Sequence, residues 1–273
     1  MSEPHSNFQT GFHGFQSGYK TGFKTVLLTR PYRQSLEVRP LFEEAGFCTE
    51  IAPAIEIVPP LSWEETDRYL ARLKDFDWLV FSSANGVRFF CDRLRDQIGR
   101  GYRAITARAI TADVAAVGSA TAEALRAEGI TVTRTAADAR AEGLVSVLED
   151  DARQGARFLW VRGSRGRDTL PSGLRALGGE IDELVVYRQA DVAKADERIA
   201  ERLAAGEFTY TTVTSSAIAR SLVRLYGERL RNTKLVSISP LTGGTLSELG
   251  FPPAFQADDA TMAGLIEAIQ NAK

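Results

Sequence analysis

Short apolar runs without a polar–apolar alternation recur along the chain. They are rich in β-branched and aromatic residues, and they comprise Thr25–Leu28, Trp78–Phe81, Phe158–Val161 and Thr211–Val213. Such runs are typical of strands that are buried on both faces of a sheet. Each run is followed by a polar or small-residue turn and then by apolar residues at helical spacing. This alternation predicts an α/β fold, in which helices cover both sides of parallel sheets.

The pattern occurs twice. Three pairs of segments match in the same order: VLLTR and FLWVR (26–30 and 158–162), VFSSANGVRFF and VTSSAIARSLV (80–90 and 213–223), and AVGSATAEALRAEGI and SISPLTGGTLSELGF (116–130 and 237–251). General α/β periodicity would repeat the apolar positions but not the Ser-Ser pair. We therefore predict an internal duplication that gives two similar doubly wound lobes.

Two segments break the strand–helix alternation. Ile51–Pro59 and Glu183–Arg188 are β-prone, are flanked by charge or proline, and lie at corresponding places in the two halves. We predict that they form a pair of connecting strands, a two-stranded β-ladder between the lobes.

The sequence lacks the residues that several common kinds of catalytic and cofactor-binding site require. Both histidines, His5 and His13, lie in residues 1–23, a polar, glycine-containing stretch that we interpret as a flexible N-terminal tail. The remaining chain therefore cannot build a Ser-His-Asp triad or a histidine metal site. No G-x-x-x-x-G-K-[ST] loop is present, and the glycine runs at Gly118 and Gly163 are too short for a dinucleotide fingerprint. We expect neither a metal nor a cofactor.

Charge and hydropathy argue against a nucleic-acid partner and against a membrane segment. The net charge of −2 gives no overall field that would attract nucleic acid or an anionic membrane. No apolar run approaches the roughly 20 residues of a membrane span. We therefore expect neither a nucleic-acid partner nor a membrane segment.

Small polar residues gather where predicted strands turn into helices. They are Ser82, Ser83, Asn85, Gly118, Ser119, Thr121, Ser164, Ser215, Ser216, Ser239 and Thr242. Each one taken alone is better explained as a helix N-cap than as a ligand contact. Together they predict a site, because ligands of open α/β sheets bind beyond the carboxyl ends of the strands, where helix N-termini offer free N–H groups. Arg30 and Arg162, at equivalent turns, could add charge-assisted hydrogen bonds to carboxylates, although both could also be solvated.

These segments, in their order, resemble the uroporphyrinogen-III synthase family. The strings that carry the resemblance are VLLTRP, DWLVFSSANGV, AVGSATAEAL, the Arg162-Gly163 turn, LVVYR, SSAIAR and ISPLT. The resemblance implies a discontinuous first lobe of residues 24–53 plus 190–273, a second lobe of residues 60–182, and connecting strands at 54–59 and 183–189. Ser239 and Leu241 depart from the small residue and second hydroxyl expected at the last turn.

The resemblance also implies a reaction. Linear hydroxymethylbilane would be cyclised with inversion of its last pyrrole ring and loss of water, through a spiro intermediate, in haem biosynthesis. Tyr187 matches the tyrosine of the family's second connecting strand and is the candidate general acid, since a phenol keeps its proton at neutral pH. A cytoplasmic monomer that makes transient contact with hydroxymethylbilane synthase is implied as well.

A second function class stays open at this point. A non-catalytic two-lobe protein could bind a tetrapyrrole or another small anion at the same turns. Such a protein would not need Tyr187, whereas the synthase would. A nucleotide-dependent transferase is disfavoured because it would require a phosphate loop.

Overall fold

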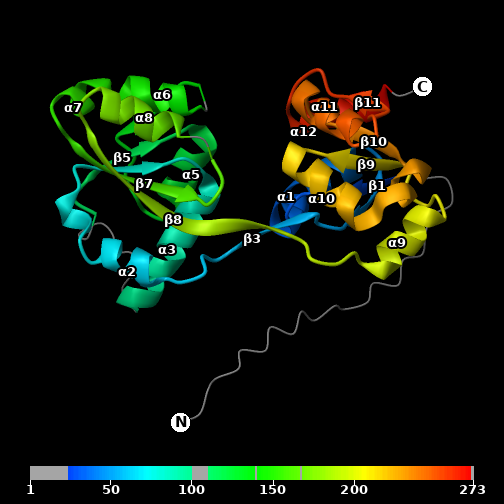
Figure 1. The fold of residues 1–273 in the computed structure, drawn as a ribbon, viewed down its shortest axis with the longest axis horizontal. Helices are drawn as coiled ribbons and strands as arrows, with labels where there is room; N and C mark the ends of the chain where they lie inside the picture. Colours follow the sequence, from blue (N-terminus) through cyan, green and yellow to red (C-terminus); the bar gives the residue numbers. More distant parts are fainter. Residues whose placement is uncertain (1–23, 100–109, 139, 167, 272–273) are drawn as a thin grey trace, which may run out of the picture.

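A computed structural model describes residues 24–99, 110–138, 140–166 and 168–271. The predicted flexible tail, residues 1–23, lies outside these described residues. The described chain forms two α/β lobes that lie side by side and are joined by a narrow ladder (Figure 1). None of its helices is both long and apolar enough to cross a membrane.

The first lobe is built from both ends of the described chain. Its elements are β1 (Thr25–Leu28), α1 (Tyr32–Glu44), β2 (Cys48–Ile51), α9 (Glu197–Ala204), β9 (Tyr210–Val213), α10 (Ser216–Tyr226), the 3-10 helix η2 (Gly227–Asn232), β10 (Lys234–Ser237), α11 (Pro240–Glu248), β11 (Phe255–Gln256) and α12 (Met262–Gln270). The five strands are parallel and lie in the order β11-β10-β9-β1-β2.

The second lobe is continuous in sequence. Its elements are β3 (Ile55–Val58), α2 (Glu64–Leu70), the 3-10 helix η1 (Leu73–Asp75), β4 (Trp78–Phe81), α3 (Ala84–Ile98), β5 (Asp113–Ala116), α5 (Ser119–Ala127), β6 (Arg134–Thr135), α6 (Ala141–Val147), α7 (Glu149–Arg153), β7 (Arg157–Gly163), α8 (Thr169–Ala176) and β8 (Glu180–Asp191). Its strand order is β6-β5-β4-β7-β8-β3, in which only β3 is antiparallel to its neighbour.

The two sheets correspond strand for strand, which confirms the predicted pair of similar lobes. The order β11-β10-β9-β1-β2 matches β6-β5-β4-β7-β8. The segments that match in sequence occupy matching places, since β9–α10 corresponds to β4–α3 and β1 corresponds to β7. In both sheets successive strands are added first on one side and then on the other, and the change of side falls between β9 and β1 and between β4 and β7. Such a point is the topological switch point, where open α/β sheets bind ligands.

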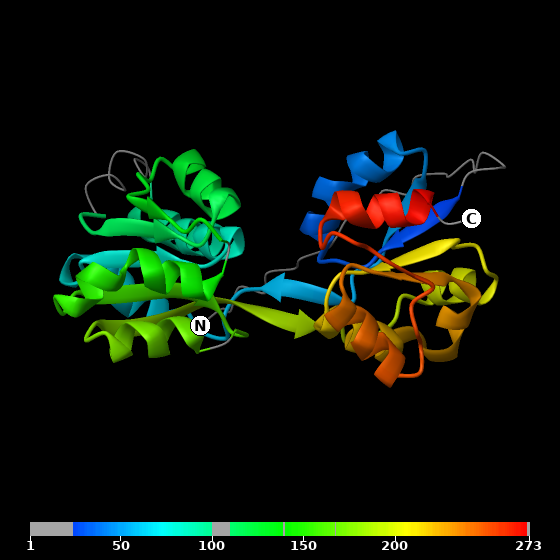
Figure 2. The ribbon, with the colours of Figure 1, turned by 90° about the horizontal axis from the view of Figure 1, so that it is seen from above.

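Burial on both faces explains why the strands lack a polar–apolar alternation. In β4, Leu79 and Phe81 pack into the core under α3 and α5, whereas Trp78 and Val80 pack into the core under α6, α7 and α8. The strands of the first lobe are divided between two cores in the same way. Figure 2 shows the helical layers on both sides of each sheet. Each lobe therefore has its own core, as expected for a doubly wound domain.

One strand serves both the second lobe and the ladder. Through Tyr187, β8 pairs with β7 in parallel; from Arg188 to Asp191 it pairs with β3 in antiparallel fashion. The strand is therefore longer than the predicted connecting segment Glu183–Arg188. Its pairing with β7 changes register between Arg162 and Gly163, which places Tyr187 opposite Gly163.

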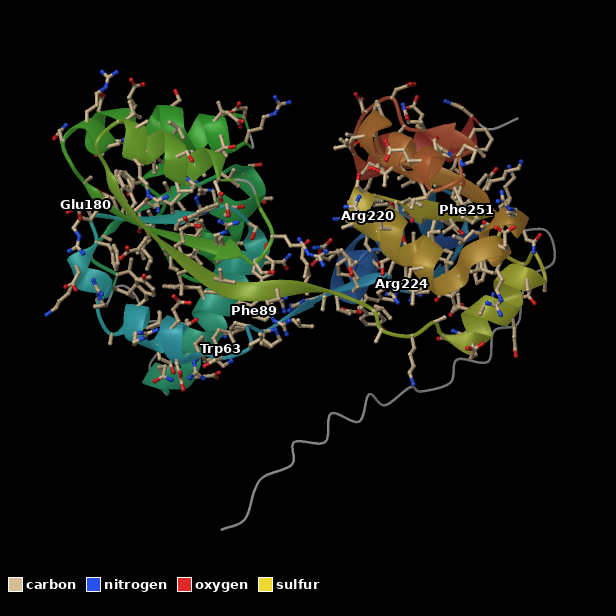
Figure 3. All side chains as sticks on the ribbon, viewed as in Figure 1. Trp63, Phe89, Glu180, Arg220, Arg224 and Phe251 are labelled. Carbon is tan, nitrogen blue, oxygen red and sulfur yellow. The ribbon has the colours of Figure 1, made fainter. Side chains whose placement is uncertain are left out.

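The ladder makes the carboxyl ends of both sheets face the gap between the lobes. Glu180, the first residue of β8, lies on the far side of the second lobe, and the strand runs from there into the ladder (Figure 3). The strands parallel to β8 therefore also end on the ladder side. In the first lobe, residues 52–54 alone separate the end of β2 from β3 in the ladder. Turns that follow the strands of each lobe consequently lie toward the other lobe.

Glu50 ties β2 to α9 and provides a pH-dependent contact in the first lobe. It accepts hydrogen bonds from Arg198 Nη2 at 2.6 Å and from Arg202 Nη1 at 3.0 Å. Burial by itself would raise the pKa of Glu50, but the hydrogen bonds and charges of the two arginines outweigh burial and hold the pKa below its ordinary value of 4.5. A carboxyl group with a depressed folded-state pKa stabilises the fold above its unfolded pKa, and this contribution is lost as the pH falls through the folded pKa.

We therefore expect Glu50→Gln to lower the melting temperature at pH 7, and we expect this difference to shrink as the pH falls below about 4.5. Calorimetry of both proteins across that range measures the difference. A gap between the two melting temperatures that is the same at every pH would contradict the assignment.

Candidate active site

Three serines cap the helices that begin at the carboxyl edges of the sheets. The Oγ of Ser83 accepts from Gly86 N at 3.0 Å, that of Ser215 accepts from Ile218 N at 3.2 Å, and that of Ser239 accepts from Thr242 N at 3.4 Å. Each backbone enters the helix from an extended conformation, as N-caps do. Capping uses the serine oxygen as an acceptor and leaves its O–H free to donate. The cap role and a ligand role are therefore compatible in the same side chain.

The phenol of Tyr187 lies at the switch point of the second lobe, where it contacts Ser83, Phe89 and Gly163. Its hydroxyl is 3.1 Å from Ser83 Oγ, and its ring stacks on Phe89 with 5.7 Å between centroids and 21° between planes. A Cβ placed on Gly163 would lie 2.5 Å from the ring, so only glycine fits beneath it. Figure 3 shows Phe89 next to β8, near the start of the ladder. The phenol is thus fixed in position by residues of β4–α3, α3 and β7.

The contact with Ser83 suits a proton donor. Because Ser83 already accepts from a backbone N–H, its own hydroxyl proton can point at Tyr187 Oη. In that arrangement the phenolic proton remains available for another acceptor. Only 7% of Tyr187 is exposed, so an acceptor would have to approach from the turn side of the sheet.

The two equivalent arginines differ in what they contact. Arg162 is buried, donates from Nη1 to Glu183 Oε2 at 2.7 Å, and lies over the Trp160 ring at 4.1 Å. Its charge is therefore already compensated. Arg30 instead donates from Nε and Nη2 to the neutral amide oxygen of Gln34, at 3.2 and 3.0 Å. Burial lowers the pKa of Arg30, and Glu37 partly offsets this effect.

Of this pair, Arg30 is better placed to receive an anion. Its partner is a neutral amide, which a carboxylate can replace at little cost. For Arg162 to bind a substrate carboxylate, it would have to give up Glu183.

The other predicted residues are divided between the two facing edges. In the second lobe, Ser82 and Asn85 are half-buried beside Ser83, Gly118 and Thr121 are buried, Ser119 is exposed, and the N–H of the exposed Ser164 donates to Tyr187 O at 2.9 Å. In the first lobe, Ser216 Oγ is 2.8 Å from Thr245 Oγ1, and the buried Thr242 has its Oγ1 3.2 Å from Ser239 Oγ. The structure thus gathers the predicted residues into two sets, one per lobe.

A hollow lies beside Ser164 at the base of the ladder. It has a volume of about 390 Å³ and is lined by Val185 and Arg188 of β8 and by Arg68 of α2, among others. Arg188 donates from Nε to Pro59 O at 3.3 Å. The hollow provides polar space next to the strand that carries Tyr187.

Sequence reasoning missed the residues that hold Tyr187. Phe89 and Gly163 do not have polar or charged side chains, and their importance depends on which residues the β7–β8 register brings together. The sequence signal that could have pointed to Gly163 is its place directly after a strand, at the turn paired with the Tyr187 strand.

Comparison with known proteins decides the family. The family model described as uroporphyrinogen-III synthase HemD matches residues 37–267. The chain belongs to the uroporphyrinogen-III synthase family. Among its relatives, the uroporphyrinogen-III synthase of Chlorobaculum parvum is 29% identical over 230 residues, which cover 83% of this chain and 90% of that protein. The uroporphyrinogen-III synthase of Synechococcus elongatus is 28% identical over 256 residues, covering 90% and 94%.

Solved structures of the uroporphyrinogen-III synthase family share the fold. The crystal structure of the Helicobacter pylori uroporphyrinogen-III synthetase aligns with a TM-score of 0.61 and 18% identity, covering 92% of this chain and 100% of that one. A mutant of the Thermus thermophilus uroporphyrinogen III synthase aligns with a TM-score of 0.56 and 18% identity, covering 90% and 96%. These likenesses confirm the two-lobe fold; the roles of the individual site residues stay predictions.

Proposed function

We propose that this chain is a uroporphyrinogen-III synthase, a hydro-lyase that cyclises hydroxymethylbilane with inversion of the last pyrrole ring. The observation that carries the proposal is Tyr187, whose phenol is held at the switch point of the second lobe by Ser83 and Phe89. The substrate carries acetate and propionate groups on each pyrrole. Capped helix N-termini on both edges suit these anions, because they offer N–H donors and the positive end of the helix dipole.

The first chemical step is loss of water. Tyr187 donates its proton to the hydroxymethyl oxygen, the C–O bond breaks, and water leaves. The electron pair of the pyrrole nitrogen stabilises the resulting cationic carbon as an azafulvene. General acid catalysis of this kind contributes about 10²- to 10⁴-fold.

Ring closure then depends on positioning. The substituted carbon of the last ring attacks the azafulvene carbon and forms the spiro intermediate. The bond from that carbon to its original methylene breaks, and the methylene bonds to the unsubstituted carbon, which loses its proton and restores the phenol. Folding the substrate so that the substituted carbon attacks first needs no nucleophile from the protein, since holding reacting atoms in place is itself a large catalytic effect.

The proposed reaction requires no cofactor. The described residues contain no group of three or more His, Cys, Asp or Glu side chains that could hold a metal ion. We further propose that the protein acts as a cytoplasmic monomer and receives its unstable substrate through transient contact with hydroxymethylbilane synthase.

A coupled assay tests the function. Hydroxymethylbilane is generated in place by its synthase, this protein is added, and the oxidised porphyrin isomers are separated by chromatography. We expect the product to shift from the type I to the type III isomer. Type I product alone, from protein whose circular dichroism shows it folded, would overturn the synthase and favour a binding protein.

A further inference from the structure

The ring of Phe89 connects the candidate acid to a positive charge. It stacks on Tyr187 with 5.7 Å between centroids, and the guanidinium carbon of Arg88 lies 4.4 Å from the centroid of the same ring. The charge of Arg88 therefore lies no farther from the centre of the phenol ring than the sum of these two distances. In Figure 3, Phe89 lies beside β8, the strand that carries Tyr187. The stack thus places a cation next to the candidate acid.

Burial and the start of α3 hold this stack in place. Phe89 and Tyr187 are both buried and belong to the same core cluster. Ser83 caps α3 and also lies 3.1 Å from the Tyr187 hydroxyl, so the helix that carries Arg88 and Phe89 is tied to the phenol at its N-cap. A cation within about 6 Å of an aromatic ring is attracted to the face of that ring. Arg88 consequently has a defined place relative to the phenol.

No acidic side chain compensates the charge of Arg88 at ion-pair distance. Of the three arginines in α3, Arg93 pairs with Asp67 at 2.5 Å and Arg95 pairs with Asp92 at 2.6 Å. Within the part of the chain that the structure describes, Arg88 forms no ion pair, and it is half-buried. A partly buried cation without a counter-ion acts over a longer range than a paired, solvated one.

Two other arginines lie near Tyr187 in the sheet, and both have acidic neighbours. Arg162 pairs with Glu183 at 2.7 Å. Arg188 lines the hollow at the base of the ladder together with two glutamates of α2. Arg88 differs from both, because its charge faces an aromatic ring instead of a carboxylate.

We propose that Arg88 assists the reaction through Phe89, by holding a positive charge beside Tyr187 when Tyr187 gives up its proton. The inference rests on the proposed function. The O–H bond of Tyr187 breaks, its proton goes to the hydroxymethyl oxygen, water leaves as the C–O bond breaks, and the phenol becomes a phenolate. The charge of Arg88 stabilises this phenolate, and the hydroxyl of Ser83 can donate a hydrogen bond to it. Arg88 is thus a positioning residue, not a proton donor or a substrate ligand.

The test compares Arg88→Gln with Arg88→Lys in initial rates of type III formation over a range of hydroxymethylbilane concentrations. Glutamine removes the charge, lysine keeps it, and both are good helix formers. We expect Arg88→Gln to lower kcat about tenfold with little change in KM, because opposite unit charges about 10 Å apart in a partly buried site change a rate by about that factor. Arg88→Lys should keep kcat within about twofold of the wild type, since an ammonium also binds an aromatic face.

A double-mutant cycle shows whether Arg88 acts through the phenol. Tyr187→Phe has no phenolic proton to donate, so no phenolate forms. Arg88→Gln in the Tyr187→Phe background should therefore leave kcat unchanged, since the two side chains serve one step. A residue that bound the substrate directly would instead raise KM in both backgrounds.

Arg231→Gln is the matched control. Arg231 also lies over an aromatic ring, with 4.7 Å between its guanidinium carbon and the centroid of Phe251, but this ring belongs to a core of the first lobe. Figure 3 shows Phe251 and Phe89 in different lobes. We expect Arg231→Gln to keep the kcat and KM of the wild type. The melting temperature of every variant establishes that it is folded, and Arg88→Met, which also lacks the charge, replaces Arg88→Gln if that variant is unfolded.

The outcomes separate this inference from the proposed function. Unchanged kcat in Arg88→Gln, with wild type that makes type III product, overturns the role of Arg88 and leaves the synthase standing. The same holds if Arg88→Lys loses as much kcat as Arg88→Gln, or if the effects of Arg88→Gln and Tyr187→Phe on kcat multiply. Wild type that makes only type I product overturns the proposed function itself.

Discussion

We expect Tyr187→Phe to lower kcat by about a hundredfold or more while leaving the fold intact, because a general acid contributes 10²- to 10⁴-fold. Phenylalanine keeps the ring that stacks on Phe89 and fills the space over Gly163. It removes only the hydroxyl and its hydrogen bond with Ser83. The variant therefore separates proton donation from packing.

The measurement is the initial rate of type III formation in the coupled assay, with the melting temperature recorded in parallel. Ser83→Ala is the informative companion, since it removes the partner of the phenol but keeps the proton donor. We expect a smaller loss of kcat for Ser83→Ala than for Tyr187→Phe. Wild-type kcat in Tyr187→Phe would show that the phenol is not the acid and that the leaving hydroxyl departs without it.

Gly163→Ala is expected to be damaging for a steric reason. The added Cβ would lie 2.5 to 2.8 Å from three atoms of Tyr187, closer than such contacts occur, so the ring must move. Forcing an extra methyl group into a packed site costs about 1–3 kcal/mol. Displacing a catalytic group by about 1 Å can cost a hundredfold in rate. We therefore expect both a lower melting temperature and a kcat reduced by about that factor.

Gly244→Ala provides the matched control. Gly244 lies in α11 with no atom within 4 Å of an added Cβ, so alanine there should stabilise the helix by about 0.5–1 kcal/mol. A double variant that combines Gly163→Ala with Tyr187→Leu tests whether steric overlap causes the loss of stability, because a smaller side chain at position 187 relieves the overlap. That double variant should regain stability relative to Gly163→Ala but stay slow. Equal stability of Gly163→Ala and wild type would contradict the steric argument.

Local patterns made the strand–turn–helix units predictable. Ser83 and Ser215 each follow a buried apolar strand and precede helical spacing, and both cap helices as such serines do. The duplication was also visible in the sequence, because the Ser-Ser turn occurs in both halves. The structure places the two turns after equivalent strands of two sheets with the same strand order. These features depend on residues that are close in sequence.

The parts that sequence reasoning missed depend on distant residues. Arg30 and Arg162 occupy equivalent turns, yet Glu183 on β8 neutralises only Arg162. The ring of Tyr187 meets Gly163 because of a register change between β7 and β8, which no local pattern specifies. Arg88 lies over the ring of Phe89, which in turn stacks on Tyr187. Each of these required the tertiary arrangement.

The interruption of the first lobe by the second determines the order in which the protein can fold during synthesis. β1 pairs with β9, whose first residue is Tyr210, so the first sheet lacks a central strand until the whole second lobe has been made. At roughly 5–20 residues per second, the edge of β1 waits unpaired for many seconds, when it is open to pairing with other chains. All three tryptophans, Trp63, Trp78 and Trp160, belong to the second lobe. Intrinsic fluorescence therefore follows the lobe that is completed first and does not report on the later closure of the first sheet.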